Sequence, residues 1–323
     1  MNVLVAIYGS HPWNIPPANV EYLRRRFPHV VFTHAAREPD VMAHIAGADV
    51  GFLGRLRAPA LAEARRLRWI HSPAAGVGNL MFPEMIASDV IITNSRGMHG
   101  AVIAEHVIGV AIVLFRRIDV AIRAQLRHRW EQANLADIRT LRGRCMGIVG
   151  LGAVGSAVAG AAAAMGMRVI ATRRRPDAPR PASVEAVYPP SQLPELLAAS
   201  DVVVLAAPNT EATQGLIGSP EIRQMKRDAI LINVARGRLI REKDLAAELA
   251  RGTIAGAALD VFDREPLDVA SPLWDLPNVL ITPHTSGFRE DYWEAAVELF
   301  ADNLRRFEAG EPLLNVVDKA AGY

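Results

Sequence analysis

Short apolar segments alternate with stretches of helical periodicity along the first hundred residues of the chain. The apolar segments are rich in Val, Ile and Phe, which is typical of strands in a buried sheet. We expect such strands at residues 2–8, 30–34, 48–54, 67–72 and 90–94. Apolar residues recur with helical spacing between them, at 18–27, 39–47 and 59–67. This alternation predicts a parallel sheet covered by helices.

A second series of the same kind begins near residue 145. Its expected strands lie at 146–150, 167–172, 201–208, 229–235, 255–262 and 279–283. Residues 100–118 are apolar for several turns and contain no Pro, so we expect one long, largely buried helix there that could also form a subunit interface. A last helix is expected at 290–310, and because no strand follows it, it could cap the first domain. The Pro-rich segment 173–190 is typical of a surface loop beside a short strand.

The composition agrees with a two-domain protein. At 323 residues and 50% hydrophobic content, the chain is long for one core and comfortable for two. The formal net charge of +2 gives no electrostatic reason to expect nucleic-acid binding. The single cysteine, Cys145, excludes a disulfide within the chain.

Targeting and metal signals are weak throughout the sequence. The first residues lack a basic start with a signal-length apolar run, and no apolar segment is long enough to span a membrane. We therefore expect a cytoplasmic protein without membrane association. The histidines show no spacing typical of metal ligands, so no metal site is expected. We expect His106 to pack or cap at the start of the 100–118 helix, whereas His99 could face a cleft.

A glycine-rich turn follows the expected strand at 146–150. Gly150, Gly152 and Gly155 form the pattern G-x-G-x-x-G between that strand and an Ala-rich helix. The first glycine permits a tight turn, the second lets a pyrophosphate approach the backbone, and the third lets the helix pack on the sheet. The amides of Gly152, Ala153 and Val154 would then point at the phosphates. The alternative is a glycine-rich turn that binds no ligand.

The next strand ends in three arginines. A site that prefers NAD usually places an acid about 20 residues after the glycine turn, where it bonds the ribose hydroxyls. Arg173 occupies that place, with Arg174 beside it. Arginine suits the 2′-phosphate of NADP, so we expect NADP to be preferred and NAD to be the weaker alternative. A solvated strand end in an Arg-rich protein is the other interpretation.

An Arg, a Glu and a His occur in order in three fragments late in the chain. Arg236 lies in NVARG, Glu265 in DVFDREP and His284 in TPH. Arg can hold a carboxylate by two parallel hydrogen bonds, and His can move a proton near neutral pH. Beside a dinucleotide that carries hydride, the set would suit a 2-hydroxy acid dehydrogenase. Taken singly, each residue has a structural interpretation: Arg236 as a surface residue, Glu265 as a turn residue and His284 as a residue at a strand end.

At this point the chain resembles the D-isomer-specific 2-hydroxyacid dehydrogenase family, which includes glyoxylate/hydroxypyruvate reductases. The matching fragments run through most of the length: AAGVG at 74–78, AEH at 104–106, GIVGLGAVG at 147–155, DVVVLAAPNTEAT at 201–213, INVARG at 232–237, LDVFDREPL at 259–267 and ITPH at 281–284.

The resemblance implies an α/β fold of two Rossmann-like or flavodoxin-like domains, each a parallel sheet flanked by helices. The cofactor domain is inserted into the substrate domain. We accordingly expect a substrate (catalytic) domain at 1–98 and 286–323, and a dinucleotide-binding domain at 99–285.

The resemblance also implies roles for single residues. Arg236 would bind the substrate carboxylate and its 2-oxygen, and Glu265 would hydrogen-bond His284. His284 would protonate the carbonyl oxygen during reduction, in contact with both substrate and cofactor. Asp260 resembles the family residue that bonds the nicotinamide carboxamide. Further cofactor contacts are expected at Ala206, Pro208, Thr213, Val234 and Ala235.

A loop early in the chain is implied to bind the substrate carboxylate. It includes Ala75, Gly76 and Val77, whose backbone amides would make the contacts. Gly78 departs from the acid often found in this loop, which leaves the polar contacts there open.

The expected function is reduction of a small 2-keto acid, such as glyoxylate or hydroxypyruvate, to the D-2-hydroxy acid by a homodimeric enzyme using NADPH. One alternative is a dinucleotide-sensing regulator of the corepressor type on the same fold. Another is a dehydrogenase of the formate or phosphite type.

Overall fold

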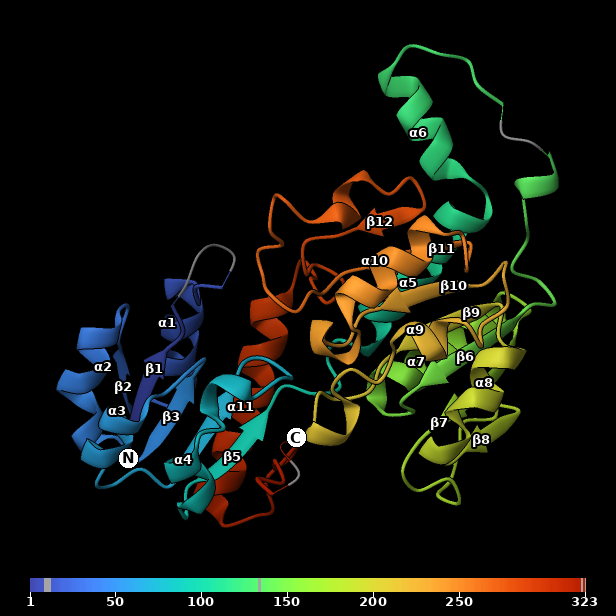
Figure 1. The fold of residues 1–323 in the computed structure, drawn as a ribbon. Coiled ribbons are helices and arrows are strands. Elements are labelled where there is room, and N and C mark those ends of the chain that lie inside the picture. The colour runs from blue at the N-terminus through green and yellow to red at the C-terminus, as the bar shows by residue number, and fades with distance from the viewer. Residues whose placement is uncertain (9–12, 133–134, 321, 323) are drawn as a thin grey trace. The chain divides into compact units, whose positions relative to one another are not determined.

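The computed structural model describes residues 1–8, 13–132, 135–320 and 322, and the chain divides into two compact units. One unit comprises residues 1–98 and 289–323, and the other comprises residues 99–288 (Figure 1). The second unit is thus inserted into the sequence of the first. The sequence predicts borders after residues 98 and 285, whereas the units divide after residues 98 and 288.

The first unit is built on a parallel sheet with the strand order β2-β1-β3-β4-β5. Its strands are β1 (Asn2–Ala6), β2 (Val31–His34), β3 (Val50–Leu53), β4 (Trp69–Ser72) and β5 (Ile91–Asn94). Its helices are α1 (Pro17–Arg26), α2 (Glu38–His44), α3 (Ala58–Glu63), α4 (Pro83–Ala87) and α11 (Tyr292–Ala309). This is the order of flavodoxin-like open sheets.

Side chains that alternate along the strands fill a core on each face of this sheet. Val3 of β1 packs in one core and Leu4 in the other, as the two-residue period of a strand requires. Helix α11 contributes to the core that contains Val3, where Phe300 stacks on Phe52 with ring centroids 4.4 Å apart. A helix from the end of the chain therefore completes the core of the first unit.

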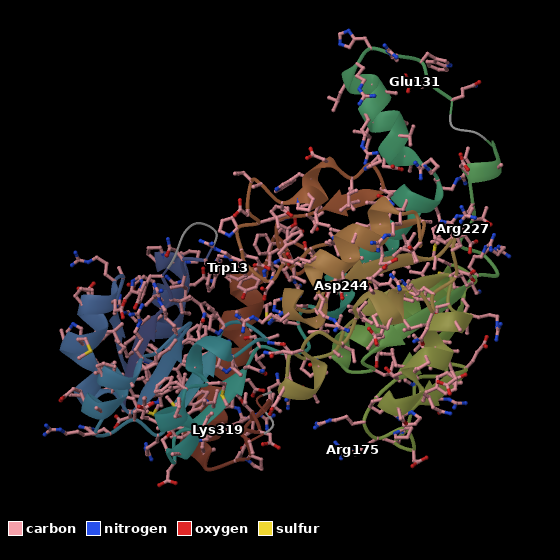
Figure 2. The ribbon with its side chains drawn as sticks, viewed as in Figure 1. Trp13, Glu131, Arg175, Arg227, Asp244 and Lys319 are labelled. Atoms are coloured by element: carbon pink, nitrogen blue, oxygen red, sulfur yellow. The ribbon has the colours of Figure 1, made fainter. Side chains whose placement is uncertain are left out.

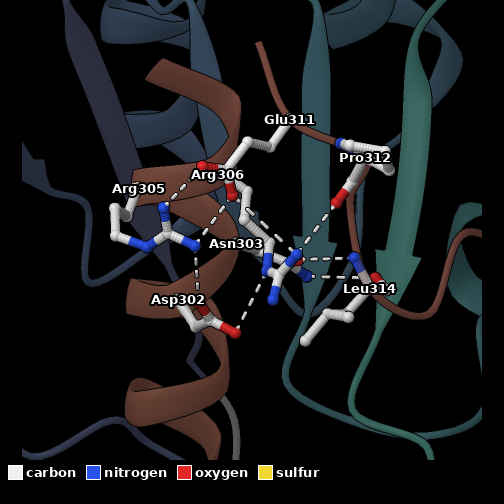
Figure 3. A network of polar contacts seen from close by, with 7 residues as sticks. All are labelled: Asp302, Asn303, Arg305, Arg306, Glu311, Pro312 and Leu314. Carbon is white, nitrogen blue, oxygen red and sulfur yellow. Dashed lines mark hydrogen bonds and ion pairs between the residues drawn. The ribbon is translucent and has the colours of Figure 1, made fainter. Parts of the chain in front are cut away.

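A polar network joins the segment after α11 to that helix (Figure 3). The buried side chain of Asn303 accepts a hydrogen bond from the N–H of Leu314 at 2.7 Å and donates one to its carbonyl at 3.1 Å. The backbone N–H of Asn94 then donates to the carbonyl of Asn315 at 3.2 Å. The end of β5 is thus held between β4 and the C-terminal segment.

The second unit is built on a larger parallel sheet with the strand order β12-β11-β10-β9-β6-β7-β8. Its strands are β6 (Cys145–Val149), β7 (Arg168–Thr172), β8 (Ala186–Tyr188), β9 (Val202–Leu205), β10 (Ile230–Asn233), β11 (Gly256–Leu259) and β12 (Val279–Ile281). Its helices are α5 (Gly100–Phe115), α6 (Ile118–Leu126), α7 (Ala153–Ala164), α8 (Leu193–Ala199), α9 (Ser219–Ile222) and α10 (Glu242–Ala250). The strand order reverses between β6 and β9, and such switch points are where open α/β sheets bind ligands.

The prediction of one helix over 100–118 is wrong at its end. Helix α5 stops at Phe115, Arg117 adopts a left-handed backbone with φ of 55°, and α6 starts at Ile118. Apolar residues such as Val107 and Ala111 of α5 are buried in the core shared with α7. The apolar run therefore reflects burial rather than a single continuous helix. Within the described residues, no helix has the length and hydropathy needed to cross a lipid bilayer.

Candidate active site

The glycine turn joins β6 to α7 at the switch point of the larger sheet. Gly150 has a φ of 104°, and a Cβ there would lie 2.6 Å from the backbone nitrogen of Ala207. A Cβ at Gly155 would lie 2.1 Å from the carbonyl oxygen of Gly150, so the fold itself requires both glycines. A Cβ at Gly152 would meet no described atom within 4 Å. The absence of a side chain there leaves the backbone at the start of α7 open to a phosphate group, so the turn fits a dinucleotide.

The segment after β9 lies beside this turn. The N–H of Ala206 donates to the carbonyl of Val149 at 2.8 Å. The hydroxyl of Thr213 donates to the carbonyl of Pro208 at 2.7 Å and accepts from the N–H of Thr210 at 2.8 Å. Because β9 neighbours β6, these predicted cofactor contacts follow adjacent parallel strands. Val234 and Ala235, both buried, follow the next strand, β10.

Arg173 follows β7 and closes the loop that it begins. Its guanidinium donates hydrogen bonds to the carbonyls of Pro179 at 3.0 Å, of Pro176 at 3.2 Å and of Ala178. Arg174 and Arg175 lie exposed on the same loop, and Arg175 is labelled in Figure 2. The guanidinium predicted to meet a 2′-phosphate is therefore also the group that fixes the loop, a role for which the sequence carries no signal.

Arg236 follows β10 on a turn that the neighbouring residues fix. The side-chain amide of Asn233 donates to the carbonyl of Arg236 at 2.9 Å. A Cβ at Gly237 would lie 1.8 Å from the carbonyl carbon of Phe262, so only glycine lets the two segments approach this closely. Surrounding protein desolvates the guanidinium and lowers the pKa of Arg236, and the Glu265 carboxylate opposes that change. Arginine remains charged after such a shift.

His284 and Glu265 form a hydrogen-bonded pair. The Nδ1 atom of His284 lies 2.6 Å from Oε2 of Glu265, and Oε1 of Glu265 accepts from the N–H of Phe262 at 3.0 Å. A carboxylate only accepts, so Nδ1 carries the proton, and Nε2 has no partner among the described residues. The two side chains remain 45% and 35% exposed, so Nε2 is accessible.

The backbone of His284 is left-handed, with φ of 55°. This conformation costs a non-glycine residue about 1 kcal/mol or more and is found preferentially at functional sites. The turn that imposes it is organised by Asp260, which is buried. Its Oδ1 accepts from the hydroxyl of Thr282 at 2.6 Å and from the N–H of Thr285 at 2.9 Å, and its Oδ2 accepts from the N–H of Ser286 at 3.0 Å.

These hydrogen bonds decide the charge of Asp260. Burial alone would raise the pKa of its carboxyl, but the hydrogen bonds from Ser286, Thr282 and Thr285 outweigh burial and lower the pKa. The carboxylate therefore holds the turn that carries His284. This structural role of Asp260 was not predictable from the sequence, because its hydrogen-bond donors are common turn residues. His106 lies on α5, with Nε2 3.4 Å from the Thr282 hydroxyl. His99 Nδ1 lies 3.2 Å from the carbonyl of Gly287.

Comparison with known proteins shows to which family the chain is similar. The family profile "D-isomer specific 2-hydroxyacid dehydrogenase, NAD binding domain" matches residues 108–286. A glyoxylate reductase of Korarchaeum cryptofilum is 35% identical over 261 residues, covering 79% of this chain and 77% of the relative. A glycerate dehydrogenase of Methylorubrum extorquens is 31% identical over 291 residues, covering 86% and 88%.

A solved structure extends the likeness over the whole chain. The NADPH-dependent glyoxylate/hydroxypyruvate reductase of Sinorhizobium meliloti, in complex with NADP and sulfate, aligns with a TM-score of 0.86 and 26% identity, covering 100% of both chains. The chain belongs to the D-isomer-specific 2-hydroxyacid dehydrogenase family. Its inserted unit contains the nicotinamide-dinucleotide-binding domain of that family.

The loop that family resemblance assigns to the substrate carboxylate lies in the other unit of this dehydrogenase. Ala75, Gly76 and Val77 follow β4; Ala75 is exposed, Gly76 is half-buried and the side chain of Val77 is buried. Arg236, Glu265 and His284 all belong to the inserted unit. Among the described residues of this family member, no group of three or more His, Cys, Asp and Glu side chains is arranged to hold a metal ion.

Proposed function

We propose that the protein reduces a small 2-keto acid of the glyoxylate or hydroxypyruvate type to the D-2-hydroxy acid, with NADPH as the preferred reductant. The observation that carries this proposal is the His284–Glu265 pair at 2.6 Å, which leaves Nε2 accessible and lies within electrostatic range of Arg236. In this proposal, the inserted unit, expected from the sequence at 99–285 and extending to residue 288, is the dinucleotide-binding domain, and the other unit is the substrate domain.

Arg236 is proposed to hold the substrate. Its guanidinium donates to the carbonyl of Ala235 at 2.6 Å, and its other N–H groups have no partner among the described residues. These groups can form two parallel hydrogen bonds with a carboxylate. A guanidinium at this place also stabilises the negative charge that develops on the 2-oxygen during reduction.

His284 is proposed to move the proton. When bound, the reduced dinucleotide supplies the hydride that adds to C2 of the keto acid. As the carbonyl oxygen gains charge, Nε2 of the protonated imidazole donates its proton, which gives the alcohol and a neutral histidine. Glu265 holds Nδ1–H and stabilises the imidazolium before transfer, and solvent then returns a proton to Nε2. Oxidation of the hydroxy acid would follow these steps in reverse.

The cofactor is proposed to bind at the glycine turn. The amides of Gly152, Ala153 and Val154 would take the pyrophosphate, with Ala206, Pro208, Thr213, Val234 and Ala235 along the same sheet edge. Asp260 is proposed to bond the nicotinamide carboxamide, since its carboxylate oxygens have lone pairs beyond those used by the turn. The arginines after β7, Arg173 and Arg174, favour a 2′-phosphate, and the similar reductase of Sinorhizobium meliloti is described as NADPH-dependent.

A homodimer is proposed as the working assembly. The apolar residues of α5 are largely accounted for by packing within the unit, so α5 offers little surface to a partner. Helix α6 instead exposes Ile118, Ile122 and Leu126, which recur every four residues along one side. An exposed apolar stripe of this kind is typical of an interaction site.

The direct test is a panel of 2-keto acids assayed with NADPH and with NADH. Glyoxylate, hydroxypyruvate and pyruvate separate the substrates by the size and polarity of the group on C2. We expect turnover of at least one small member, with a higher kcat/KM for NADPH. Absence of turnover with every keto acid and both cofactors would refute the proposed reaction.

A further inference from the structure

The loop after β4 presents its carbonyl groups to donors of the surrounding protein. The carbonyl of Pro73 accepts from the hydroxyl of Tyr292 at 2.9 Å, that of Ala74 from the N–H of Ser95 at 3.2 Å, and that of Ala75 from the side-chain amide of Asn94 at 2.7 Å. Three consecutive carbonyls of the loop are thus hydrogen-bonded to donors on α11 and at the end of β5.

The direction of these carbonyls fixes the direction of the amides. In a trans peptide the C=O and the N–H of the next residue point in opposite directions. The N–H groups of Ala75 and Gly76 therefore point away from Ser95 and Asn94, the adjacent residues at the end of β5. Neither N–H has an acceptor among the described residues. Successive backbone amides turned to one side form an anion-binding concavity.

The two side chains that hold these carbonyls, Asn94 and Tyr292, are buried. Asn94 is 2% exposed, and its Oδ1 accepts from the N–H of Arg96 at 3.3 Å. Tyr292 is buried at the start of α11, and burial raises the pKa of its hydroxyl, which therefore stays protonated and able to donate. The loop itself remains accessible, because Ala75 is exposed and Gly76 is half-buried.

We propose that Asn94 and Tyr292 are positioning residues that aim the amides of Ala75 and Gly76 at the carboxylate of the substrate. The proposal rests on the proposed function, since it assigns the loop to a 2-keto acid. Without the Asn94 amide, the carbonyl of Ala75 would lose its donor and the peptide would be free to turn. The carboxylate would then face an N–H that is no longer held in the binding direction.

Steady-state kinetics of Asn94→Ala, Asn94→Asp and Tyr292→Phe test this proposal. The carboxylate is bound equally in the ground state and the transition state, so KM for the keto acid should rise while kcat changes little. A lost hydrogen bond to a charged group predicts a rise of roughly tenfold for both Asn94 variants. Tyr292→Phe, which keeps the ring, should give a smaller rise of about threefold. KM for NADPH should not change in any variant.

Two matched controls remove the same chemical groups elsewhere in the first unit. Asn2→Ala removes an amide that donates to the carbonyl of Gly47 at 3.0 Å, and Tyr22→Phe removes a hydroxyl that donates to Glu298. Both should keep the wild-type KM. A thermal melt checks that each variant is folded, and Tyr292→Phe keeps the test open if Asn94→Ala does not fold.

Several outcomes would overturn the proposal. Unchanged KM in the Asn94 variants would do so, as would a rise confined to Asn94→Asp, which would mean charge repulsion alone. Equal changes in kcat and in KM for NADPH would indicate a general structural role. If the wild type reduces no keto acid, the proposed reaction is wrong. Calorimetric titration with oxamate, which carries a carboxylate, then still measures whether the loop binds a carboxylate. Wild-type affinity for oxamate should then exceed that of Asn94→Ala roughly tenfold.

Discussion

At the scale of single residues, His284 differs from a structural histidine because it combines a left-handed backbone with a carboxylate partner on Nδ1. The turn held by Asp260 imposes that conformation and brings Nδ1 to Glu265. We predict that His284→Ala lowers kcat by a factor on the order of 10²–10⁴, the usual contribution of general acid catalysis, with little change in KM for NADPH. Steady-state assays at saturating keto acid measure this.

A second histidine provides a matched control for that change. His128 also has φ of 55° and is exposed in the same unit, so His128→Ala removes an imidazole from a similar backbone conformation. It should retain wild-type kcat. Near-normal turnover in His284→Ala would remove His284 from the mechanism.

The guanidinium of Arg236 offers a planar pair of donors that a lysine cannot reproduce. We predict that Arg236→Lys, which keeps the charge, raises KM for the keto acid and lowers kcat. Arg238→Lys is the control, since Arg238 is exposed two residues further and pairs with Asp263 at 3.1 Å. Wild-type kcat/KM in Arg236→Lys would contradict the two-pronged contact.

His71 belongs to a buried chain of hydrogen bonds whose direction can be deduced. Ser95 Oγ donates to the carbonyl of Ser72 at 3.0 Å, so Nε2 of His71, 3.2 Å away, must donate to Ser95. Burial lowers the pKa of His71 to about 3, so the ring is neutral. Nδ1 is then the acceptor for the hydroxyl of Thr93 at 2.7 Å.

This neutral histidine predicts a dependence of stability on pH. The folded pKa lies below the unfolded value of 6.5, so between pH 6.5 and about 3 the unfolded chain binds a proton that the folded chain does not. Stability is therefore lost as pH falls through that window. From pH 7 to 5 we predict that His71 accounts for roughly 2 kcal/mol of the loss. Urea unfolding of the wild type and of His71→Gln at both values measures it, and equal losses in the two proteins would contradict the prediction.

At the scale of elements, the loop after β7 is the place to test the predicted preference for NADPH over NADH. Arg173 both closes this loop and stands where a 2′-phosphate would bind. If it also meets the phosphate, Arg173→Asp should raise KM for NADPH at least tenfold more than it raises KM for NADH. If it only fixes the loop, both values should rise together.

The exposed neighbours of Arg173 complete that experiment. Arg174→Ala and Arg175→Ala leave the loop hydrogen bonds of Arg173 in place. If the guanidinium of Arg174 or Arg175 reaches the phosphate, its removal should raise KM for NADPH and leave KM for NADH unchanged. Added salt should reduce the NADPH preference, since the loop is exposed. Equal use of NADH and NADPH by the wild type would contradict the preference.

The elements themselves were largely predictable from the sequence, because strand and helix periodicities differ and the glycine turn has a fixed context. The parallel architecture of both sheets is confirmed. The break at Arg117 was not predictable, since neither Gly nor Pro marks it. The donors Asn94 and Tyr292 were not predictable as partners of one loop either, because they are nearly 200 residues apart and meet only through folding.

At the scale of the whole molecule, the exposed end of the inserted unit predicts the state of assembly. Helix α6 and the segment that includes Glu131 project from the sheet of their unit (Figures 1 and 2). Leu126 is 79% exposed and Trp130 is 95% exposed. Burying an apolar side chain of this size stabilises an interface by about 1.5–3 kcal/mol, so a second copy of the chain would gain from covering this face.

We therefore predict that light scattering finds about 70 kDa, twice the 35.0 kDa of one chain. Leu126→Arg puts a charge on the α6 face and should shift the protein toward 35 kDa as it is diluted. Met165→Arg alters another exposed apolar residue of the same unit, 41% exposed at the end of α7, and should leave the mass unchanged. A wild-type mass near 35 kDa at every concentration would exclude the dimer, and equal dissociation by both variants would mean that the α6 face is not its interface.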